Sequence, residues 1–392
     1  MAQRSIIAGI DMGTHSTRVV VCEVPSEEGV LPRIIGTGFA ESRGLRHGYV
    51  VDPHEAAKSV RIAIASAEKS SGVPIRRALV SIGGISVESM LSHGTMMISR
   101  ADGEVSSLDI EKAVDESEEA LSGITNKEIL QVVPLRYRLD TKEVHGRPNG
   151  LKGSKLEVKT FFITCLKQHM TDLMSVVEEA GVQVEDIVPS PVAAARIALT
   201  KHQRVAGCVL ANIGAETVSI VVFENDMPIS LQVFPIGSVN ITNDIALGLR
   251  IPIEDAEKLK LGDYTGAYPR KKLDEIVEAR LSEIFELVEA HLKKIGKNGL
   301  LPAGIILTGG GAGIATIQDL ARVILKLPSS LALPDLPGNQ KTTIKDSSWF
   351  VAYGLCSYGT KRSKNGGDDN ALSAWFSKVG TAIKNWFEQY LP

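Results

Sequence analysis

The chain has 392 residues, of which 44% are hydrophobic and 23% are charged, and its formal net charge is −3. A chain of this length is too long for one compact hydrophobic core, so we expect two or more domains. The near balance of charge gives no basis for expecting nucleic acid as a partner, and no run of about 18 apolar residues predicts a transmembrane helix.

The four cysteines are scattered along the chain without a C-x-x-C pair. We expect them to be small buried residues of a protein in the reducing cytosol. We expect neither a disulfide framework nor a zinc site. Their positions are Cys22, Cys165, Cys208 and Cys356.

The first 160 residues predict two regions. Residues 5–24 read as strand, glycine turn and strand, and the chain enters them without a segment typical of a signal peptide. Residues 52–72 carry apolar residues at helical spacing, and 77–84 predict a short buried strand that ends in a glycine turn. Residues 84–161 form a region of their own, with short alternating strands around an acidic helical stretch.

The opening pattern returns at residue 205, where "VAGCVLANIGAETVSIVVFENDMP" again reads as strand, glycine turn and strand. We interpret this as an internal repeat, with two halves built alike that each present one turn. Further helices and strands are expected around it. They are a strand at 159–168, helices at 170–181, 190–199, 254–260, 273–296 and 347–360, and a strand, glycine run and helix at 303–325.

Two such turns could clamp one polyphosphate between two domains. Glycine lets backbone N–H groups turn outward toward an anion. Thr14, His15, Ser16 and Thr217 add side-chain donors, and Asp11 could hold water on a magnesium ion, which prefers oxygen ligands. Each motif alone is typical of an ordinary tight turn, so the prediction depends on their order and spacing.

That order resembles the superfamily of actin, sugar kinases and heat-shock ATPases, and the resemblance implies ATP with Mg²⁺ in a cleft between two domains. Two motifs are similar to its phosphate loops, and "LTGGGA" to its adenosine loop. Glu257 and Lys260 share one helix face where the superfamily contacts adenine or ribose, although a solvated ion pair is the alternative. The implied nucleotide-binding residues are Asp11, Gly13, Thr14, His15, Asn212, Gly214, Thr217, Glu257, Lys260, Gly309, Gly310, Gly311 and Ala312.

Asn212 departs from the superfamily pattern, which usually places an aspartate there. An amide cannot act as a carboxylate toward metal-bound or attacking water. ATP binding is expected to survive, but fast hydrolysis is not, so we expect a weak ATPase at most. Asp11 alone is expected to hold the metal, through water.

The region 84–161 and the stretches 44–64 and 240–266 resemble the FtsA family of bacterial cell-division proteins, over about residues 5–360. The resemblance implies an α/β, actin-like two-domain ATPase fold with an inserted strand-helix-strand subdomain. The implied division is subdomain 1A at 1–83, 162–199 and 349–363, subdomain 1C at 84–161, subdomain 2A at 200–224 and 300–348, subdomain 2B at 225–299, a linker at 364–370 and an amphipathic helix at 371–392.

The last 22 residues hold two of the three tryptophans. At 100° per residue, their apolar side chains fall within an arc of about 120°, which is typical of a helix lying in a membrane interface. A helix packed on its own domain or on a partner is the alternative. The predicted membrane-binding residues are Leu372, Trp375, Phe376, Val379, Ile383, Trp386, Phe387 and Tyr390.

The FtsA resemblance implies a peripheral protein at the cytoplasmic face of the membrane at the division site. It implies filaments with copies of itself, binding to the FtsZ C-terminal tail and to anionic lipid, and contacts with other division proteins. Arg280 is our candidate contact for the acidic FtsZ tail, with a solvated helix arginine as its alternative. A PilM-type pilus-assembly scaffold, a true ATPase or phosphotransferase, and an MreB-type filament remain the competing hypotheses.

Overall fold

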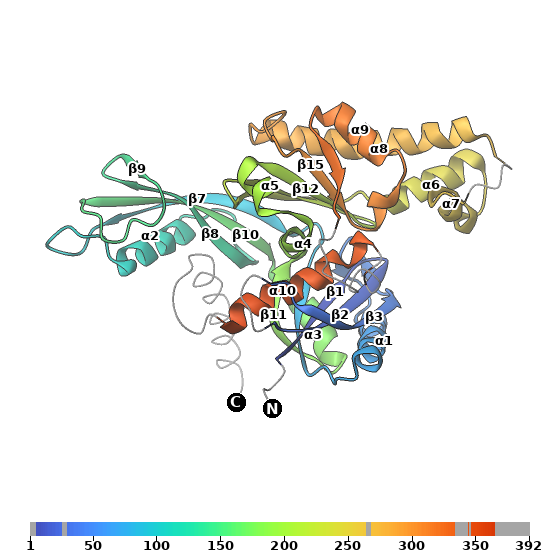
Figure 1. Ribbon diagram of the computed structural model, residues 1–392, viewed down its shortest axis with the longest axis horizontal. Helices are drawn as coiled ribbons and strands as arrows, with labels where there is room; N and C mark the ends of the chain where they lie inside the picture. Colours follow the sequence, from blue (N-terminus) through green and yellow to red (C-terminus); the bar gives the residue numbers. More distant parts are fainter. Residues whose placement is uncertain (1–4, 26–29, 264–267, 334–343, 345, 365–392) are drawn as a thin grey trace.

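The computed structural model describes residues 5–25, 30–263, 268–333, 344 and 346–364 (Figure 1). The predicted linker beyond 364 and the aromatic helix at 371–392 lie outside this part of the chain. Within it, no helix combines the length and the apolar character needed to cross a membrane. All four cysteines are buried and none forms a disulfide, as the sequence predicted.

Two five-stranded sheets with the same topology confirm the internal repeat. In each, three antiparallel strands in chain order are followed by two strands added in parallel. The first sheet is the centre of the part that we call domain 1. Its strand order is β11 (Gln183–Pro189), β6 (Arg77–Ile82), β1 (Ile6–Met12), β2 (Ser16–Glu23) and β3 (Arg33–Glu41). The second, domain 2, has the order β14 (Met227–Phe234), β13 (Val218–Glu224), β12 (Cys208–Ile213), β15 (Ile305–Thr308) and β16 (Ser329–Leu331).

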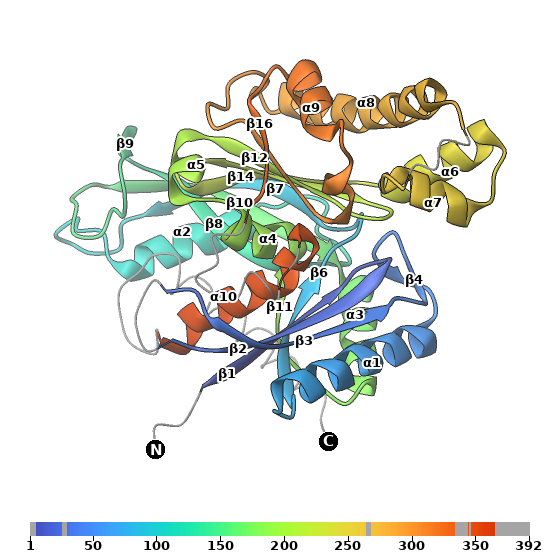
Figure 2. The same ribbon diagram turned by 45° about the vertical axis from the view of Figure 1, so that its right-hand side comes forward.

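Helices cover both faces of each sheet, so the molecule is layered (Figures 1 and 2). The outer face of the first sheet carries α1 (Pro53–Ser71) and α3 (Lys167–Glu179). Two helices share a core with both sheets and lie between them, α4 (Ser190–Ala198) and α10 (Phe350–Lys364). The outer face of the second sheet carries α6 (Ser238–Leu249), α7 (Ile253–Lys260), α8 (Arg270–Lys294) and α9 (Ile317–Leu325).

Short elements complete the two domains. Leu45–Arg46 and Tyr49–Val50 form a small antiparallel hairpin, β4 and β5, between β3 and α1. The others are α5 (Lys201–Ala206) and the 3-10 turns η1 (Gly310–Gly313) and η3 (Ser347–Trp349).

The insertion, residues 84–161, forms an antiparallel sheet of its own with one helix on it. The acidic stretch is α2 (Ser107–Glu119), as predicted, and its Ser106 and Asp109 form a reciprocal N-terminal cap. Three strands are longer than the sequence suggested. The sheet order is β7 (Glu88–Met97), β10 (Lys155–Leu166), β8 (Lys127–Leu139) and β9 (Lys142–Val144).

The insertion is joined to both domains. Strand β10 runs without interruption from Lys155 to Leu166 and leads directly into α3, so the expected boundary at 161 falls within a strand. Strand β7 contacts β14, which lies in the expected 2B segment but forms the edge of the second sheet. The Ser89 hydroxyl donates to the Leu231 carbonyl and accepts from the Leu231 N–H, both at 2.9 Å.

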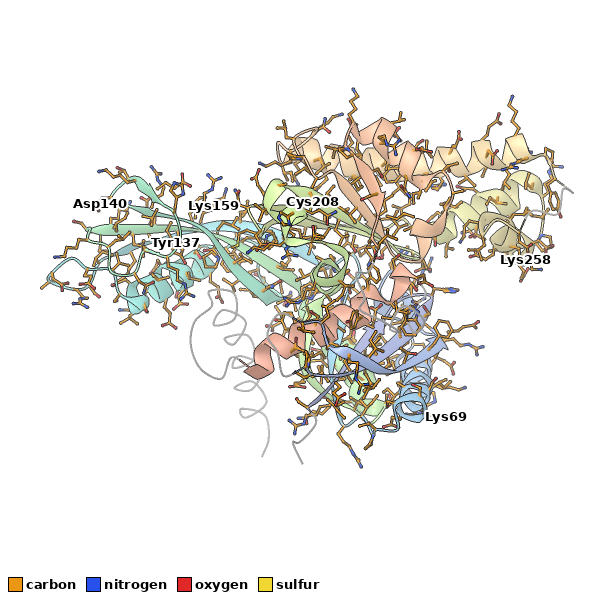
Figure 3. All side chains as sticks on the ribbon, viewed as in Figure 1. Lys69, Tyr137, Asp140, Lys159, Cys208 and Lys258 are labelled. Carbon is orange, nitrogen blue, oxygen red and sulfur yellow. The ribbon has the colours of Figure 1, made fainter. Side chains whose placement is uncertain are left out.

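Figure 3 shows how far the extremities lie from each other. Asp140, on the insertion, is at one tip of the molecule, and Lys258, on α7, is near the other. The two sheets and the loops between them therefore lie at the centre.

Candidate functional site

The predicted glycine turns at the ends of β1 and β12 have the same geometry. The Gly13 N–H donates to the Ser16 carbonyl at 3.1 Å, and the Gly214 N–H donates to the Thr217 carbonyl at 2.9 Å. A Cβ atom at Gly13 or Gly214 would lie 3.0 or 2.9 Å from the same carbonyl, so both turns favour glycine. Each domain therefore presents one equivalent loop.

Asp11 lies at the base of the first loop and is 9% exposed. Its carboxylate accepts a hydrogen bond of 2.6 Å from the Ser81 hydroxyl of the neighbouring strand β6. Burial raises the pKa of Asp11, and the Ser81 hydrogen bond and the Arg18 charge offset that rise only in part. A carboxylate desolvated in this way gains from a nearby cation, which is the chemistry expected of a metal-water ligand.

Arg18 is a feature that the sequence did not reveal. It is the strand partner of Asp11 in the β1–β2 hairpin. Its guanidinium lies 5.5 Å from the ring centre of Trp349 and 5.6 Å from that of Phe39. Two aromatic rings and the negative charges of Asp11 and Asp346 thus stabilise a largely buried cation beside the first loop.

The second and third predicted loops touch each other. Asn212 is the strand partner of Thr308. A Cβ atom at Gly309 would lie 2.3 Å from Asn212 Oδ1, and Gly309 has φ of +89°. The glycine run is therefore required at Gly309 by both space and backbone angle, whereas Gly310 faces open space.

The start of α6 fixes the second loop from behind. The N–H groups of Ser238 and Val239 donate to the carbonyls of Gly214 and Ala215 at 2.9 and 2.8 Å. A Cβ atom at Gly237 would lie 2.4 Å from the Ala215 carbonyl oxygen, so only glycine fits there. The start of α6 thus holds the loop closely on this side.

Lys260 is not the solvated helix lysine of the alternative interpretation. Its side chain is 5% exposed, while that of Glu257 is 42% exposed. The ammonium donates to Glu257 Oε2 at 2.7 Å, to Thr242 Oγ1 at 2.9 Å and to the Ser238 carbonyl at 3.3 Å. Lys260 is thereby engaged with its own domain, and Glu257 is the more exposed member of the pair.

The pKa of Glu257 is also affected by a residue of the first loop. Burial raises the pKa of its carboxyl, but hydrogen bonds from Lys260 and Thr242 outweigh this effect and leave the pKa below its ordinary value. The charges of Lys260 and of His15, which lies in the first loop of domain 1, lower it further. A residue of domain 1 thus affects the ionisation of a residue of domain 2.

Glu216, within the second loop, makes a direct bridge between the domains. Its Oε2 accepts a hydrogen bond of 2.6 Å from the backbone N–H of His47, at the tip of the β4–β5 hairpin. His47 Nδ1 lies 3.3 Å from the Glu216 carbonyl oxygen. Neither Glu216 nor His47 was among the predicted site residues. A charged side chain between Gly214 and Thr217, in a loop expected to bind phosphate, was the available signal.

The turn before α10 joins the third loop to the first. Ser347 Oγ donates to the Gly309 carbonyl at 3.3 Å, and Thr308 Oγ1 donates to the Ser347 carbonyl at 3.4 Å. Two residues later, Trp349 stacks on Arg18. The structure therefore places the three predicted loops and α7 next to one another where the two domains meet.

Arg280 lies apart from these loops, on α8. Its guanidinium forms ion pairs with Asp244 and Glu283, so the solvated arginine of the alternative interpretation is not what the structure contains. The predicted membrane-binding side chains from Leu372 to Tyr390 lie outside the described residues.

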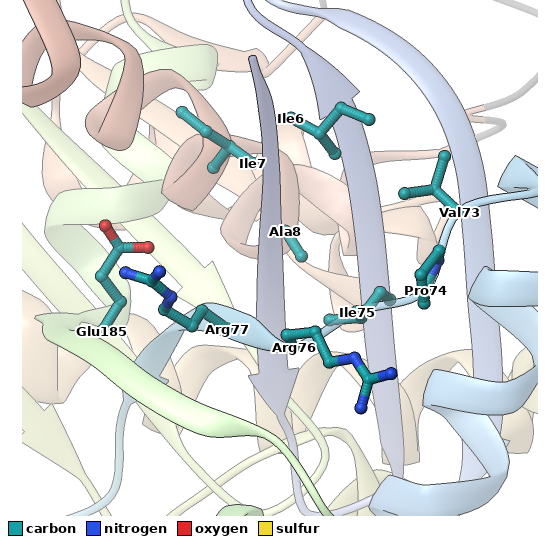
Figure 4. A pocket seen from close by; sticks show the side chains of 9 residues that line it. All are labelled: Ile6, Ile7, Ala8, Val73, Pro74, Ile75, Arg76, Arg77 and Glu185. Carbon is teal, nitrogen blue, oxygen red and sulfur yellow. The ribbon is translucent and has the colours of Figure 1, made fainter. Parts of the chain in front are cut away.

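A cavity of about 330 Å³ lies at the other end of the first sheet (Figure 4). It opens because the pairing of β1 with β6 begins only at Gly9 and Leu79, which leaves the preceding residues of the two strands apart. Ile6, Arg76, Arg77 and Glu185 are among the residues that line it. The three glycine loops follow the opposite ends of their strands and contribute no residue to the lining, so this cavity is separate from the loops.

Comparisons with protein families match two parts of the chain. The family model described as "Cell division protein FtsA" matches residues 209–354, and the model described as "SHS2 domain inserted in FTSA" matches residues 84–164. Cell division protein FtsA of Pseudomonas aeruginosa is 31% identical over 383 residues, which cover 92% of this chain and 91% of that protein. Its counterpart in Bacillus subtilis is 30% identical and covers 93% and 86%.

Solved structures share the fold at lower identity. A chain of the PilM–PilN type IV pilus biogenesis complex has a TM-score of 0.66 and 18% identity, and covers 91% of this chain and 99% of that one. MreB5 of Spiroplasma citri bound to ADP has a TM-score of 0.52 and 15% identity, with coverage of 92% and 99%. These likenesses confirm the expected actin-like architecture.

Proposed function

This chain belongs to the FtsA family of cell division proteins, and we propose that it is an ATP-binding adaptor that links FtsZ to the cytoplasmic membrane. The observation that carries the nucleotide part is the pair of equivalent turns at Gly13 and Gly214, one in each domain. Backbone N–H groups in such turns favour phosphate oxygens. The resemblance in fold to the ADP-bound MreB5 structure supports the same proposal.

In this proposal, the predicted residues of the three loops and α7 would contact different parts of the nucleotide. Gly13, Thr14 and His15 would hold phosphate from domain 1, while Gly214 and Thr217 would hold it from domain 2. The segment from Gly309 to Ala312 would line the nucleoside, with Glu257 at the base or ribose and Lys260 holding Glu257 in place. Asp11 would bind Mg²⁺ through water, and the ion would screen the phosphate charge.

Slow hydrolysis follows from Asn212 in the same proposal. Its carboxamide has neither the charge nor the basicity to orient and deprotonate an attacking water. We therefore assign ATP a structural role, in which the bound nucleotide holds the two domains together. Turnover within the usual enzyme range of about 1–1000 per second would instead favour the ATPase or phosphotransferase hypothesis.

The membrane and FtsZ parts rest on the family and on the sequence of the chain end. We propose that residues 371–392 form an amphipathic helix whose aromatic side chains enter the lipid interface. One such helix binds reversibly, so self-association into filaments would strengthen attachment through avidity. The acidic FtsZ tail is proposed to bind 225–299.

Co-sedimentation with anionic vesicles tests the adaptor proposal. The full chain and a chain ending at Asp369 are compared, each with and without ATP. Pelleting of the full chain alone is the expected result. If neither chain pellets with lipid, residues 371–392 belong to a protein interface, and a PilM-type scaffold becomes the better hypothesis.

A further inference from the structure

We infer that Glu216, His47 and His169 are positioning residues that couple the second phosphate loop to the base of the insertion. The inference rests on the proposed nucleotide site and adds to it a chain of contacts from that site to the insertion. The route runs from Glu216 through the β4–β5 hairpin to His169. It ends at Ser86, two residues before the first strand of the insertion.

The first link crosses between the domains. Glu216 belongs to the loop proposed to hold phosphate, and its carboxylate accepts the His47 N–H at 2.6 Å. A polyphosphate placed against the Gly214 turn adds negative charge close to this carboxylate, and like charges repel. Nucleotide binding therefore acts directly on the Glu216–His47 contact.

The second link is a close backbone contact between the β4–β5 hairpin and the first residue of the insertion. Gly48, next to His47, has φ of +85°, and a Cβ atom there would lie 2.5 Å from the Cα of Gly84. Gly84 has φ of +88° and is the first residue of the insertion. A hairpin seated this closely cannot shift without moving the chain at Gly84, because packed interiors transmit displacement.

The third link is a buried histidine. His169 is 2% exposed, its Nε2 lies 3.0 Å from the Gly48 carbonyl oxygen, and its Nδ1 lies 2.6 Å from Ser86 Oγ. A carbonyl oxygen only accepts, so Nε2 carries the proton, and the neutral ring accepts the Ser86 hydroxyl at Nδ1. The Tyr49 ring stacks on the imidazole, with 4.5 Å between centres.

His169 and its partner Ser86 lie next to the two ends of the insertion in the chain. Strand β10 of the insertion ends at Leu166, and α3 begins at Lys167. His169 is thus three residues past the last strand of the insertion, while Ser86 is two residues before the first, at Glu88. One imidazole joins both connections of the insertion to the hairpin that touches Glu216.

Amide hydrogen exchange with Mg²⁺ and ATP tests the inference, with ATP binding measured separately by fluorescence anisotropy of a labelled analogue. In the unaltered protein, saturating ATP should change exchange at least about threefold at both 44–50 and 84–97. Glu216→Ala and His169→Ala should each abolish the change at 84–97, at ATP concentrations saturating for that variant. Exchange in the loops at 11–17 should still respond.

Two comparisons make the test specific. Glu216→Gln keeps an acceptor for the His47 N–H but removes the charge that the phosphate repels, so it should lose the response at 84–97 although the contact remains. His54→Ala, at an exposed ring on α1, should leave the response unchanged. If the response at 84–97 persists in Glu216→Ala, the inference is wrong. Because Glu216→Ala alters an accessible loop, this outcome does not depend on whether the His169→Ala variant folds.

The remaining outcomes separate this inference from the proposed function. If the unaltered protein binds ATP but shows no change at 84–97, only the coupling is wrong. If it binds no ATP, the proposed function fails, and the coupling fails with it. A double variant at Glu216 and His169 should lose no more than either single variant, since both act on one route.

Discussion

Arg280 and Asp244 form a two-pronged ion pair that joins α8 to α6. Arg280 Nε lies 2.6 Å from Asp244 Oδ2, and Nη2 lies 3.1 Å from Oδ1. Glu283, one turn further along α8, contacts the remaining guanidinium nitrogen. Any acidic peptide that binds Arg280 must therefore compete with two carboxylates of the same domain.

This geometry predicts opposite effects of two substitutions on binding of an acidic FtsZ tail peptide. Arg280→Met should weaken binding, because it removes the cation. Asp244→Asn should strengthen binding, because it releases the guanidinium from its main partner. Fluorescence anisotropy of a labelled peptide measures both. Each change should cost about 1 kcal/mol of stability or less, since the pair is partly exposed.

Asp274→Asn, on the same helix at an exposed position, is the matched control for loss of a negative charge. Unchanged peptide affinity in both Arg280→Met and Asp244→Asn would move the FtsZ contact away from this part of α8.

Asn212→Asp should increase ATP turnover by about tenfold or more, because a carboxylate can polarise water where an amide cannot. The two side chains have the same shape, so the contact of Asn212 with Gly309 is preserved. Phosphate release at saturating ATP measures the rate. Asp11→Asn should remove the Mg²⁺ dependence of ATP binding, both in the unaltered protein and in Asn212→Asp. If Asn212→Asp turns over ATP at the same rate as the unaltered protein, residue 212 does not limit hydrolysis.

Gly309→Ala and Gly310→Ala should differ although the two residues are neighbours. A methyl group at Gly309 would meet Asn212 Oδ1 at 2.3 Å on a backbone with φ of +89°, whereas Gly310 has open space. We expect a loss of about 2 kcal/mol or more for Gly309→Ala and about 0.5 kcal/mol or less for Gly310→Ala. Urea denaturation without nucleotide compares the two free energies of unfolding, and equal losses would contradict the close approach.

Stability should fall as the pH drops below about 6.5. Burial lowers the pKa of His169 from its ordinary value of 6.5, and burial with the charge of Lys294 lowers that of His291. The unfolded chain then binds more protons than the folded one, so the stability present above 6.5 is lost as the pH falls toward the lowered values. Each histidine can contribute up to about 1.4 kcal/mol per pH unit.

Denaturation at several pH values between about 5.5 and 7.5 measures this slope. His169→Gln should flatten it, while His54→Gln should leave it unchanged because that ring is exposed. The same slope in His169→Gln as in the unaltered protein would show that His169 does not contribute.

Local patterns in the sequence predicted much of the fold. The repeated strand–turn–strand motif, the helix expected at 190–199 and the acidic helix α2 depend on nearby residues, and each has its expected structure. The three glycine loops also converge, because two similar halves place equivalent turns at equivalent strand ends. Strand β14 was not recognised, since its place depends on pairing with β13.

The missed site residues share a physical cause. Ser81 contacts Asp11, Arg18 contacts Trp349, and His47 contacts Glu216, and all three pairs are far apart in the sequence. Such contacts are created by the packing of sheets and loops and leave no periodic pattern. Lys260 shows the same limit, because its spacing from Glu257 predicts the pair but not its burial.

The contact between Ser89 and Leu231 has a consequence for how this architecture can be altered. One hydroxyl satisfies both backbone groups of Leu231, and Leu231 and Val233 share a core with Leu130, Val133 and Phe161 of the insertion. Deleting residues 84–161 would uncover an apolar sheet edge, and such edges cause aggregation. The insertion is therefore not a detachable module. Grafting it onto another actin-like protein would require the recipient to supply a matching β14.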